Sequence, residues 1–322
     1  MKHGKKSFMI IEAVLGILVI LVLGFIIYKQ NGHEPATIAV IIPDVDESEW
    51  SAFKYGLKMA AREYDANVVI ISKDNMETAN EEIGIMNQEI IKGADAVIVK
   101  PIANQNGRQN LKQLEKSVPI MAVGDTFPEE PSGLHTIEPD HYHMGADLAQ
   151  KLLENYRGNL IGKKIGIYSQ HAASEAVIKR KKGICDTLKG SGAEILWSVS
   201  KENDSKEKIN LQTQRRVDIV MALDNASFVE AGEAAKDNYL YGAVLYGIGN
   251  STEAVYYLDA GWAQCLVVPD EFDAGYESVA ELIKKRRNFF YKMKDRQITY
   301  TVLTRENLFS EENRNLLFTI SR

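Results

Sequence analysis

Eight short apolar runs recur along the chain, and each ends on a polar or turn residue before a helix-like segment begins. The runs are Thr37–Pro43, Asn67–Ser72, Asp95–Pro101, Pro119–Gly124, Lys164–Gln170, Val217–Asp224, Ala243–Gly249 and Ala263–Asp270. Because these runs are rich in Val and Ile and lack polar alternation, they are typical of strands buried on both faces. Strands that alternate with helices form βαβ units. The sequence therefore predicts an α/β fold with helix-covered parallel sheets, in which ligands bind beyond the carboxyl ends of the strands.

The bulk composition limits the classes of protein that the chain can belong to. Its 322 residues are enough for two domains of ordinary size. A formal net charge of −6 and the lack of an extended basic face argue against a nucleic-acid partner. The two basic runs, Lys179–Lys182 and Lys284–Arg287, are interpreted as solvated sides of helices. Cys185 and Cys265 lack metal-binding spacing and are expected to be buried free thiols, although a disulfide between them stays open.

An apolar segment near the N-terminus predicts a membrane anchor. Phe8–Tyr28 carries one charged residue, Glu12, and as a helix would be about 30 Å long, which matches a bilayer core. Three preceding lysines place the N-terminus in the cytoplasm. We therefore expect a single-pass cell-membrane protein with residues 1–7 cytoplasmic, 8–28 transmembrane, 29–36 as a tether and the remainder extracellular.

Two other interpretations of this segment are less favourable. A cleaved signal peptide is disfavoured because the segment is longer than a usual apolar region and no A-x-A-like site follows it. No Cys follows either, so a lipoprotein-type site is absent. The start of the segment resembles that of a type IV prepilin, but Ser7 stands where a Gly would be expected. An uncleaved anchor is the favoured interpretation.

The strand and helix pattern divides into two groups of similar order. Asp125–Asp140 is irregular, contains Pro and Gly, and is expected to lead from one sheet to another. Late in the chain, Ala263–Asp270 precedes a helix over Phe272–Arg287, and Gln297–Asn307 is expected to be a strand. The similar order of the two groups indicates a weak internal duplication of architecture.

Several stretches together resemble the type I periplasmic solute-binding proteins, which include ribose- and galactose-binding proteins and the ligand domain of lactose-repressor-like regulators. The stretches are Ile38–Pro43 with Trp50 and Gly56, Gly93–Val99, Ile137–Asp140 with Gly145 and Ala149, Val268–Tyr276, and Thr304–Asn307. A membrane segment stands where a regulator would have its helix-turn-helix, so the regulator branch is excluded.

This resemblance implies two Rossmann-like lobes that close on a ligand like a hinged clamp. The N-terminal lobe would comprise residues 37–125 with 269–296, and the C-terminal lobe residues 126–268 with 297–322. Three crossovers would join them, near Thr126–His135, Leu266–Pro269 and Lys294–Thr301.

Strand-end geometry and the resemblance converge on one set of candidate ligand-binding residues. They are Asp46, Glu49, Trp50, Lys100, Asp125, Arg180, Asp224, Asn225, Asn250, Asp270 and Phe272. A sugar needs an aromatic plate for its C–H face, here Trp50, and planar polar groups for its hydroxyls, here Asp125 and Asp224. Each has an alternative: Trp50 as a core residue, the two aspartates as helix caps or turn residues, and Arg180 as a solvent-facing residue.

The usual sugar-contact residues of the resembled family are largely replaced. Lys100 stands where an Asn is common, and Ile178 stands where an Arg is common. Lys100 would suit an anionic ligand, or would form a buried ion pair with Asp125. His141 and His143 form an H-x-H pair, which is interpreted as polar residues at a helix start and not as a metal site.

No catalytic motif or cofactor signature occurs in the sequence, so we expect a binding protein and not an enzyme. The main hypothesis is a membrane-anchored solute-binding protein that delivers a sugar-like, possibly anionic ligand to an ABC permease. The alternative is a ligand-sensing subunit that signals to a membrane histidine kinase or chemoreceptor. A third hypothesis is an enzyme or a ligand-free scaffold derived from the fold.

Overall fold

The computed structural model describes residues 12–24, 35–43, 48–73, 78–102, 107–124, 134–170, 174–201 and 209–321. The chain divides into two units, Met1–Ala36 and Thr37–Arg322. In the first unit, residues 12–24 form a helix whose large apolar side chains are exposed. The remainder of the expected anchor, residues 8–11 and 25–28, lies outside the described residues, as do residues 1–7 and 29–34. Within the described ranges, no helix combines the length and apolar character needed to cross a membrane.

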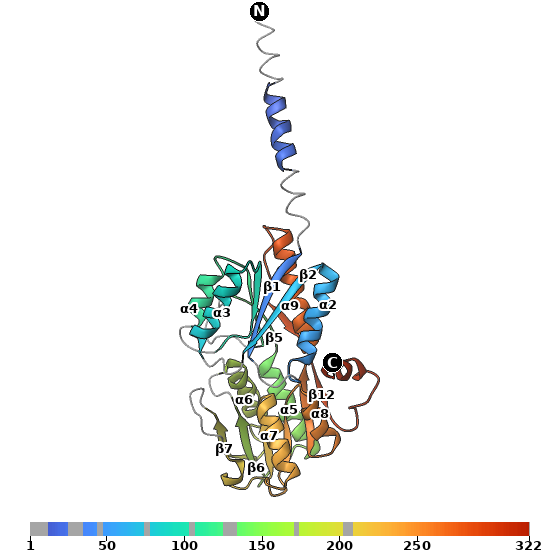
Figure 1. Ribbon diagram of the computed structural model, residues 1–322. Coiled ribbons are helices and arrows are strands. Elements are labelled where there is room, and N and C mark those ends of the chain that lie inside the picture. Colours follow the sequence, from blue (N-terminus) through green and yellow to red (C-terminus); the bar gives the residue numbers. More distant parts are fainter. Residues whose placement is uncertain are drawn as a thin grey trace, which may run out of the picture. The chain divides into compact units, whose positions relative to one another are not determined.

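The second unit contains two six-stranded sheets, one in each of two lobes (Figure 1). The first sheet has the order β11-β5-β4-β3-β1-β2, and the second has the order β12-β10-β9-β8-β6-β7. The strands of the first sheet are β1 Ala36–Pro43, β2 Ala66–Lys73, β3 Ala96–Val99, β4 Ile120–Val123, β5 His135–Pro139 and β11 Arg296–Ile298. Those of the second are β6 Lys164–Ser169, β7 Glu194–Ser200, β8 Ile219–Ala222, β9 Val244–Ile248, β10 Ala263–Pro269 and β12 Tyr300–Leu303.

Helices alternate with these strands, as the sequence predicts. Around the first sheet lie α2 Ser51–Tyr64, α3 Ala79–Ile91, α4 Gly107–Leu114 and α9 Glu271–Arg287. The second sheet is accompanied by α5 His141–Asn155, α6 Glu175–Thr187, α7 Asn225–Lys236, α8 Thr252–Asp259 and the C-terminal α10 Arg314–Ile320. All eight apolar runs contain a strand. The pairs β1–β3, β3–β4, β6–β8, β8–β9 and β9–β10 are parallel, whereas β12 runs antiparallel to β10.

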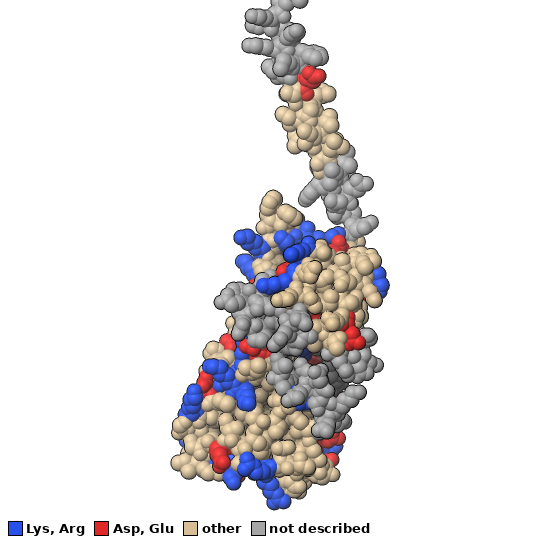
Figure 2. Space-filling view, turned by 90° about the vertical axis from the view of Figure 1, so that its left-hand side faces the viewer, with Lys and Arg blue, Asp and Glu red and all other residues tan. Residues whose placement is uncertain are grey.

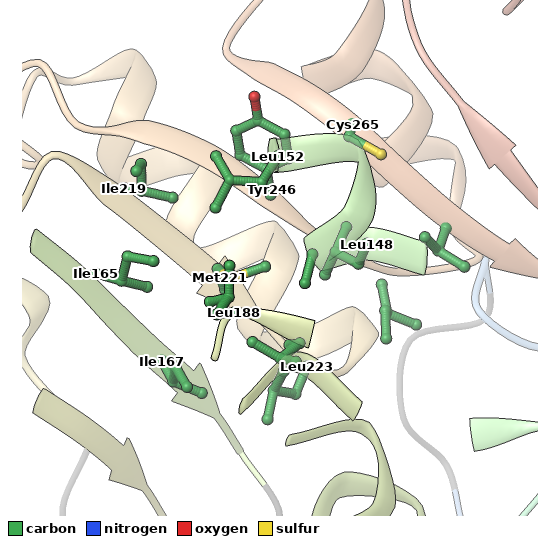
Figure 3. Close-up of a cluster of buried hydrophobic side chains, with 14 of the residues drawn as sticks. Leu148, Leu152, Ile165, Ile167, Leu188, Ile219, Met221, Leu223, Tyr246 and Cys265 are labelled. Atoms are coloured by element: carbon green, nitrogen blue, oxygen red, sulfur yellow. The ribbon is translucent and has the colours of Figure 1, made fainter. Parts of the chain in front are cut away.

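The central strands of the second sheet are buried on both faces. Ile219 and Met221 of β8 pack with α5 residues in one cluster (Figure 3), while the alternating Val220 and Ala222 pack with Phe228 of α7 in another. This alternation explains why the strand sequence is uniformly apolar, because both sets of side chains meet a helix layer. Cys265 is buried in the first of these clusters and Cys185 is half-buried, and both are free thiols.

Two boundaries differ from those expected. The first crossover lies between β5 and α5, later than Thr126–His135, because His135–Pro139 forms a strand that pairs with β4 and so still belongs to the first sheet. The predicted strand Gln297–Asn307 is instead two short strands in different sheets. Of these, β11 pairs with β5 and β12 pairs with β10, with Thr299 between them. This division occurs because the third crossover falls inside the apolar pattern.

One close helix contact in each lobe depends on a pair of glycines. A Cβ atom on Gly56 of α2 would lie 2.0 Å from the Phe272 carbonyl oxygen of α9, and one on Gly275 would lie 2.3 Å from that of Phe53. In the second lobe, a Cβ on Gly145 of α5 would lie 2.0 Å from the carbonyl oxygen of Arg180 in α6. The two lobes therefore repeat the same backbone-to-backbone contact, which supports the expected duplication of architecture.

We predict that Gly145→Ala lowers the free energy of unfolding by about 1–3 kcal/mol or more, because the added methyl group has no space between two backbones. Gly84→Ala is the matched control, since Gly84 lies on an exposed face of α3 with no atom within 4 Å of the new carbon. It should stabilise the protein by roughly 0.5–1 kcal/mol. Urea unfolding of both variants measures the difference, and equal effects would contradict the proposed packing constraint.

Candidate functional site

The carboxyl ends of the two sheets meet where three hydrogen bonds join the lobes. Asn250, after β9, donates from Nδ2 to the Glu49 backbone oxygen over 3.1 Å. Asn225 Nδ2 lies 3.5 Å from Glu49 Oε2, and Ser48 Oγ donates to Glu253 Oε2 over 2.6 Å. Glu49, Asn225 and Asn250, which come from segments far apart in sequence, are therefore brought together as the strand-end argument predicts.

The first lobe contributes an aromatic ring and a cation to this cluster. Lys100 Nζ lies 4.8 Å from the centroid of the Trp50 ring and 3.9 Å from Glu49 Oε1. Trp50 is only 5% exposed, and its ring also meets Phe53 edge-on at 5.5 Å. Its Nε1 is buried without a hydrogen-bond partner among the described residues. Because a buried indole N–H usually has an acceptor, this atom is a candidate donor to a ligand oxygen.

Asp224 and Asn225 are held rigidly at the start of α7. Asp224 caps the helix by accepting from Ser227 N over 2.8 Å, and its other oxygen accepts from Gln170 N over 2.8 Å. The Asn225 Oδ1 atom accepts from the backbone N–H groups of Asn250 and Ser251, both over 3.1 Å. Both Asp224 carboxylate oxygens are thus engaged by backbone donors, which agrees with the helix-cap alternative for this residue. Asn225 fixes the loop that presents Asn250.

Arg180 points into the protein instead of into solvent, so the solvent-facing alternative is wrong. Its Nη1 donates to the Leu223 carbonyl oxygen over 2.7 Å, and its Nε donates to His141 Nδ1 over 3.3 Å. His141 Nε2 lies 3.1 Å from the Gly124 carbonyl oxygen of the first lobe. Since Nδ1 accepts a hydrogen bond, a neutral imidazole would carry its proton on Nε2 and donate it to Gly124. His141 therefore links the Arg180 side chain to the end of β4 beside the crossover.

His141 was not among the predicted ligand-binding residues. Its sequence signals are the H-x-H pair with His143 and its position two residues after the strand end at Pro139, where it resembles an ordinary residue of a helix start. The neighbouring His143 instead pairs with Asp140 over 2.6 Å and is exposed. No group of acidic, His or Cys residues suited to a metal ion occurs among the described residues.

At the second crossover, Asp270 caps α9 by accepting from Asp273 N over 3.1 Å. Phe272 packs in the helix layer, with its ring centroid 5.5 Å from that of Tyr55 and 6.2 Å from that of Tyr276. Between them, Glu271 was also missed by sequence reasoning. Burial raises the pKa of Glu271 to about 7, while the nearby charges of Lys100 and Arg180 favour its ionised form. The Glu271 carboxyl group thus interacts electrostatically with the Lys100 and Arg180 side chains.

Two candidates, Asp46 and Asp125, lie outside the described residues. Consequently the possible ion pair between Lys100 and Asp125 stays a prediction. The described partner of Lys100 is Glu49.

These observations define a two-lobe α/β fold in which polar side chains of both lobes meet at the carboxyl ends of the strands. The sequence model of the periplasmic binding protein domain family matches residues 38–286. The chain therefore belongs to this family, which confirms the resemblance found in the sequence. The sequence matches no curated protein significantly.

Solved structures agree with this assignment. A carbohydrate transporter solute-binding protein from Agrobacterium radiobacter, in complex with D-arabinose, is 16% identical with a TM-score of 0.78 and covers 88% of this chain and 99% of its own. A myo-inositol-binding protein from Caulobacter is 16% identical with a TM-score of 0.72, covering 86% and 97%. The XylFII–LytSN complex contains a chain 14% identical with a TM-score of 0.70, covering 85% and 99%. Identities this low establish the fold alone.

We predict different effects for alanine at the two cleft asparagines. Asn225→Ala should cost about 1–3 kcal/mol in the free energy of unfolding, because two buried backbone N–H groups lose their acceptor. Asn250→Ala should cost less, because the described acceptor of its side chain belongs to the other lobe. Urea unfolding of the ligand-free protein compares them. If Asn250→Ala lowered the free energy of unfolding as much as Asn225→Ala or more, it would contradict these assignments. Asn225 would then not be the residue that stabilises the second lobe, with Asn250 serving to join the two lobes.

Proposed function

We propose that the protein clamps a small polar, sugar-like ligand between its lobes and delivers it to an ABC importer. The observation that carries this proposal is the meeting of Asn225, Asn250 and Glu49 beside Trp50, whose buried N–H lacks a partner among the described residues. Membership of the periplasmic binding protein family supports a binding role. The complexes of structurally similar proteins with D-arabinose and myo-inositol support a polyhydroxylated ligand.

The donor and acceptor groups of the cleft match the chemistry of such a ligand. An amide side chain donates and accepts hydrogen bonds, and a carboxylate accepts from hydroxyl groups. Asn250 donates directly to the Glu49 backbone oxygen across the lobes. A bound ligand would take up these groups from both lobes at once and so stabilise the closed form, which would dock on the permease.

Lys100 favours an anionic ligand within this class. Its ammonium group lies against the Trp50 ring, where an anionic group on a ligand could meet it. A sugar phosphate or sugar acid would therefore gain an attraction that a neutral sugar lacks. Glu49, at 3.9 Å, is the competing partner of the same cation.

The test is a thermal-shift screen against pentoses, hexoses, inositols and their phosphates, followed by calorimetry with Trp50→Phe. This variant keeps an aromatic ring but loses the indole N–H, and we expect roughly tenfold weaker binding. Trp262→Phe is the control, because Trp262 follows α8, outside the cluster at the strand ends, and should leave affinity unchanged. The proposal fails if no compound of these classes shifts the unfolding temperature.

We further propose that Phe8–Tyr28 anchors the chain in the cell membrane, with the N-terminus in the cytoplasm and the binding unit outside. The support is the apolar sequence and the three preceding lysines. The full chain should resist alkaline carbonate extraction, whereas a chain lacking residues 8–28 should be released. Protease added to intact cells should digest the binding unit. Release of the full chain by carbonate would contradict the anchor.

A second candidate function is ligand sensing for a histidine kinase or chemoreceptor. It is favoured by the similarity to XylFII, which forms a complex with LytSN, and by the apolar N-terminal segment, which suits lateral pairing in a membrane. Cross-linking in native membranes, with and without the sugar found in the screen, separates the candidates. Capture of a permease supports transport, and capture of a kinase or receptor supports sensing.

A further inference from the structure

The first lobe carries an unusual surface at the end opposite the cleft. Residues 284–294 comprise the last turn of α9 and the loop that follows it, and are called here the basic aromatic loop. They contain six basic and no acidic residues, with Phe289 and Phe290 in the middle. Their side chains are 83% and 87% exposed. Ile91, at the end of α3, is 84% exposed, and these three are the most exposed large apolar side chains among the described residues of Thr37–Arg322.

This loop has a defined shape. Lys285 Nζ donates to the carbonyl oxygens of Phe289 and Tyr291 over 2.8 and 2.9 Å, which closes the chain around one ammonium group. The two phenylalanine rings meet edge-on, with centroids 5.6 Å apart. A hydrogen-bonded turn at the end of α9 therefore holds the two phenylalanine rings in place.

Hydrogen bonds place the loop beside the point where the chain enters the lobe. Asp95 accepts from the backbone N–H of Thr37 over 2.9 Å, and the same carboxylate pairs with Arg286. Figure 1 shows β1 beginning and α9 ending at the same end of the lobe, and Figure 2 shows blue Lys and Arg side chains gathered there. Ile91 belongs to this end as well, because it lies four residues before Asp95.

Exposed basic residues surround the aromatic pair. Arg287 is fixed by donating to the Tyr64 carbonyl oxygen over 2.9 Å. Lys292 and Lys294 are exposed, and neither has an ion pair with a residue that the structure describes. Aromatic side chains flanked by basic ones suit the boundary of a bilayer, where the rings enter the headgroup region and the cations meet anionic lipid.

Chain length brings this surface within reach of a membrane. Eight residues separate Tyr28 from Thr37, and fully extended they span at most about 28 Å. If Phe8–Tyr28 lies in the bilayer, Thr37 cannot lie more than about 28 Å from the end of the apolar segment, so the adjoining loop can reach the headgroups. We propose that the basic aromatic loop, with Ile91, docks the first lobe on an anionic lipid surface. This inference rests on the anchoring proposed above.

The test uses the full chain reconstituted in phosphatidylcholine vesicles with about 30% phosphatidylglycerol and brominated lipid. Brominated lipid should quench a fraction of the Trp emission in Phe290→Trp that is more than about twice the fraction quenched in the wild type. The reason is that the added indole enters the headgroup region. Phe309→Trp is the matched control, since Phe309 is 71% exposed but lies between β12 and α10 in the second lobe. It should show wild-type quenching.

Adding Lys292→Glu and Lys294→Glu to Phe290→Trp should abolish the extra quenching, as should high salt. Quenching of Phe290→Trp no greater than that of Phe309→Trp overturns the proposal, as does quenching insensitive to charge. Capture of a protein by a photo-cross-linker at position 290, without quenching in vesicles, overturns it in favour of a protein partner. Carbonate resistance and the sugar-induced thermal shift, measured on the same variants, separate failure of this contact from failure of the anchor or of ligand binding.

Discussion

The close contact between two helices in each lobe is the constraint on which the cleft depends. Gly56 and Gly275 bring α2 against α9, and Gly145 with Gly183 brings α5 against α6. All four helices begin beside the cleft, directly after Trp50, Asp270, Asp140 and Ser174. Their spacing therefore sets the positions of Glu49, His141 and Glu271. A wider helix pair would move these side chains apart without changing any residue of the site, which is why the packing and the binding chemistry are linked.

Within the cleft, the polar groups divide by whether their hydrogen bonds stay inside one lobe or cross between lobes. Those of Asp224 and the Asn225 oxygen stay within the second lobe and give it a fixed wall. Those of Asn250, Ser48 and His141 cross to the other lobe or reach its strand end. Separation of the two lobes would break the second set and leave the first intact, so a ligand of the proposed kind would compete with the crossing contacts.

The strands could be predicted from the sequence because burial on both faces leaves an uninterrupted apolar run, as in Ile219–Ala222. The strand-end rule likewise predicted that Glu49, Asn225 and Asn250 lie close together. The crossovers were less predictable, because β5 is short and half-exposed and because β11 and β12 share one apolar stretch although they belong to different sheets. His141 and Glu271 were missed because each looks like a helix-start residue. The hydrogen-bond partners of His141 are Gly124 and Arg180, which lie 17 and 39 residues away in the chain. The cations near Glu271, Lys100 and Arg180, are still farther away in the sequence.

The topology of a parallel sheet also separates the two surfaces proposed here. Every strand of the first sheet that leads into the cleft begins at the opposite end of the lobe, where Thr37, Asp95 and Arg286 are joined. A chain that enters through β1 from a membrane must therefore present its strand starts to the lipid and its strand ends to the ligand. Contact between the basic aromatic loop and a bilayer would leave the cleft unobstructed. It would also hold the first lobe while the second lobe moved, so that closure would be a motion of the second lobe toward a fixed one.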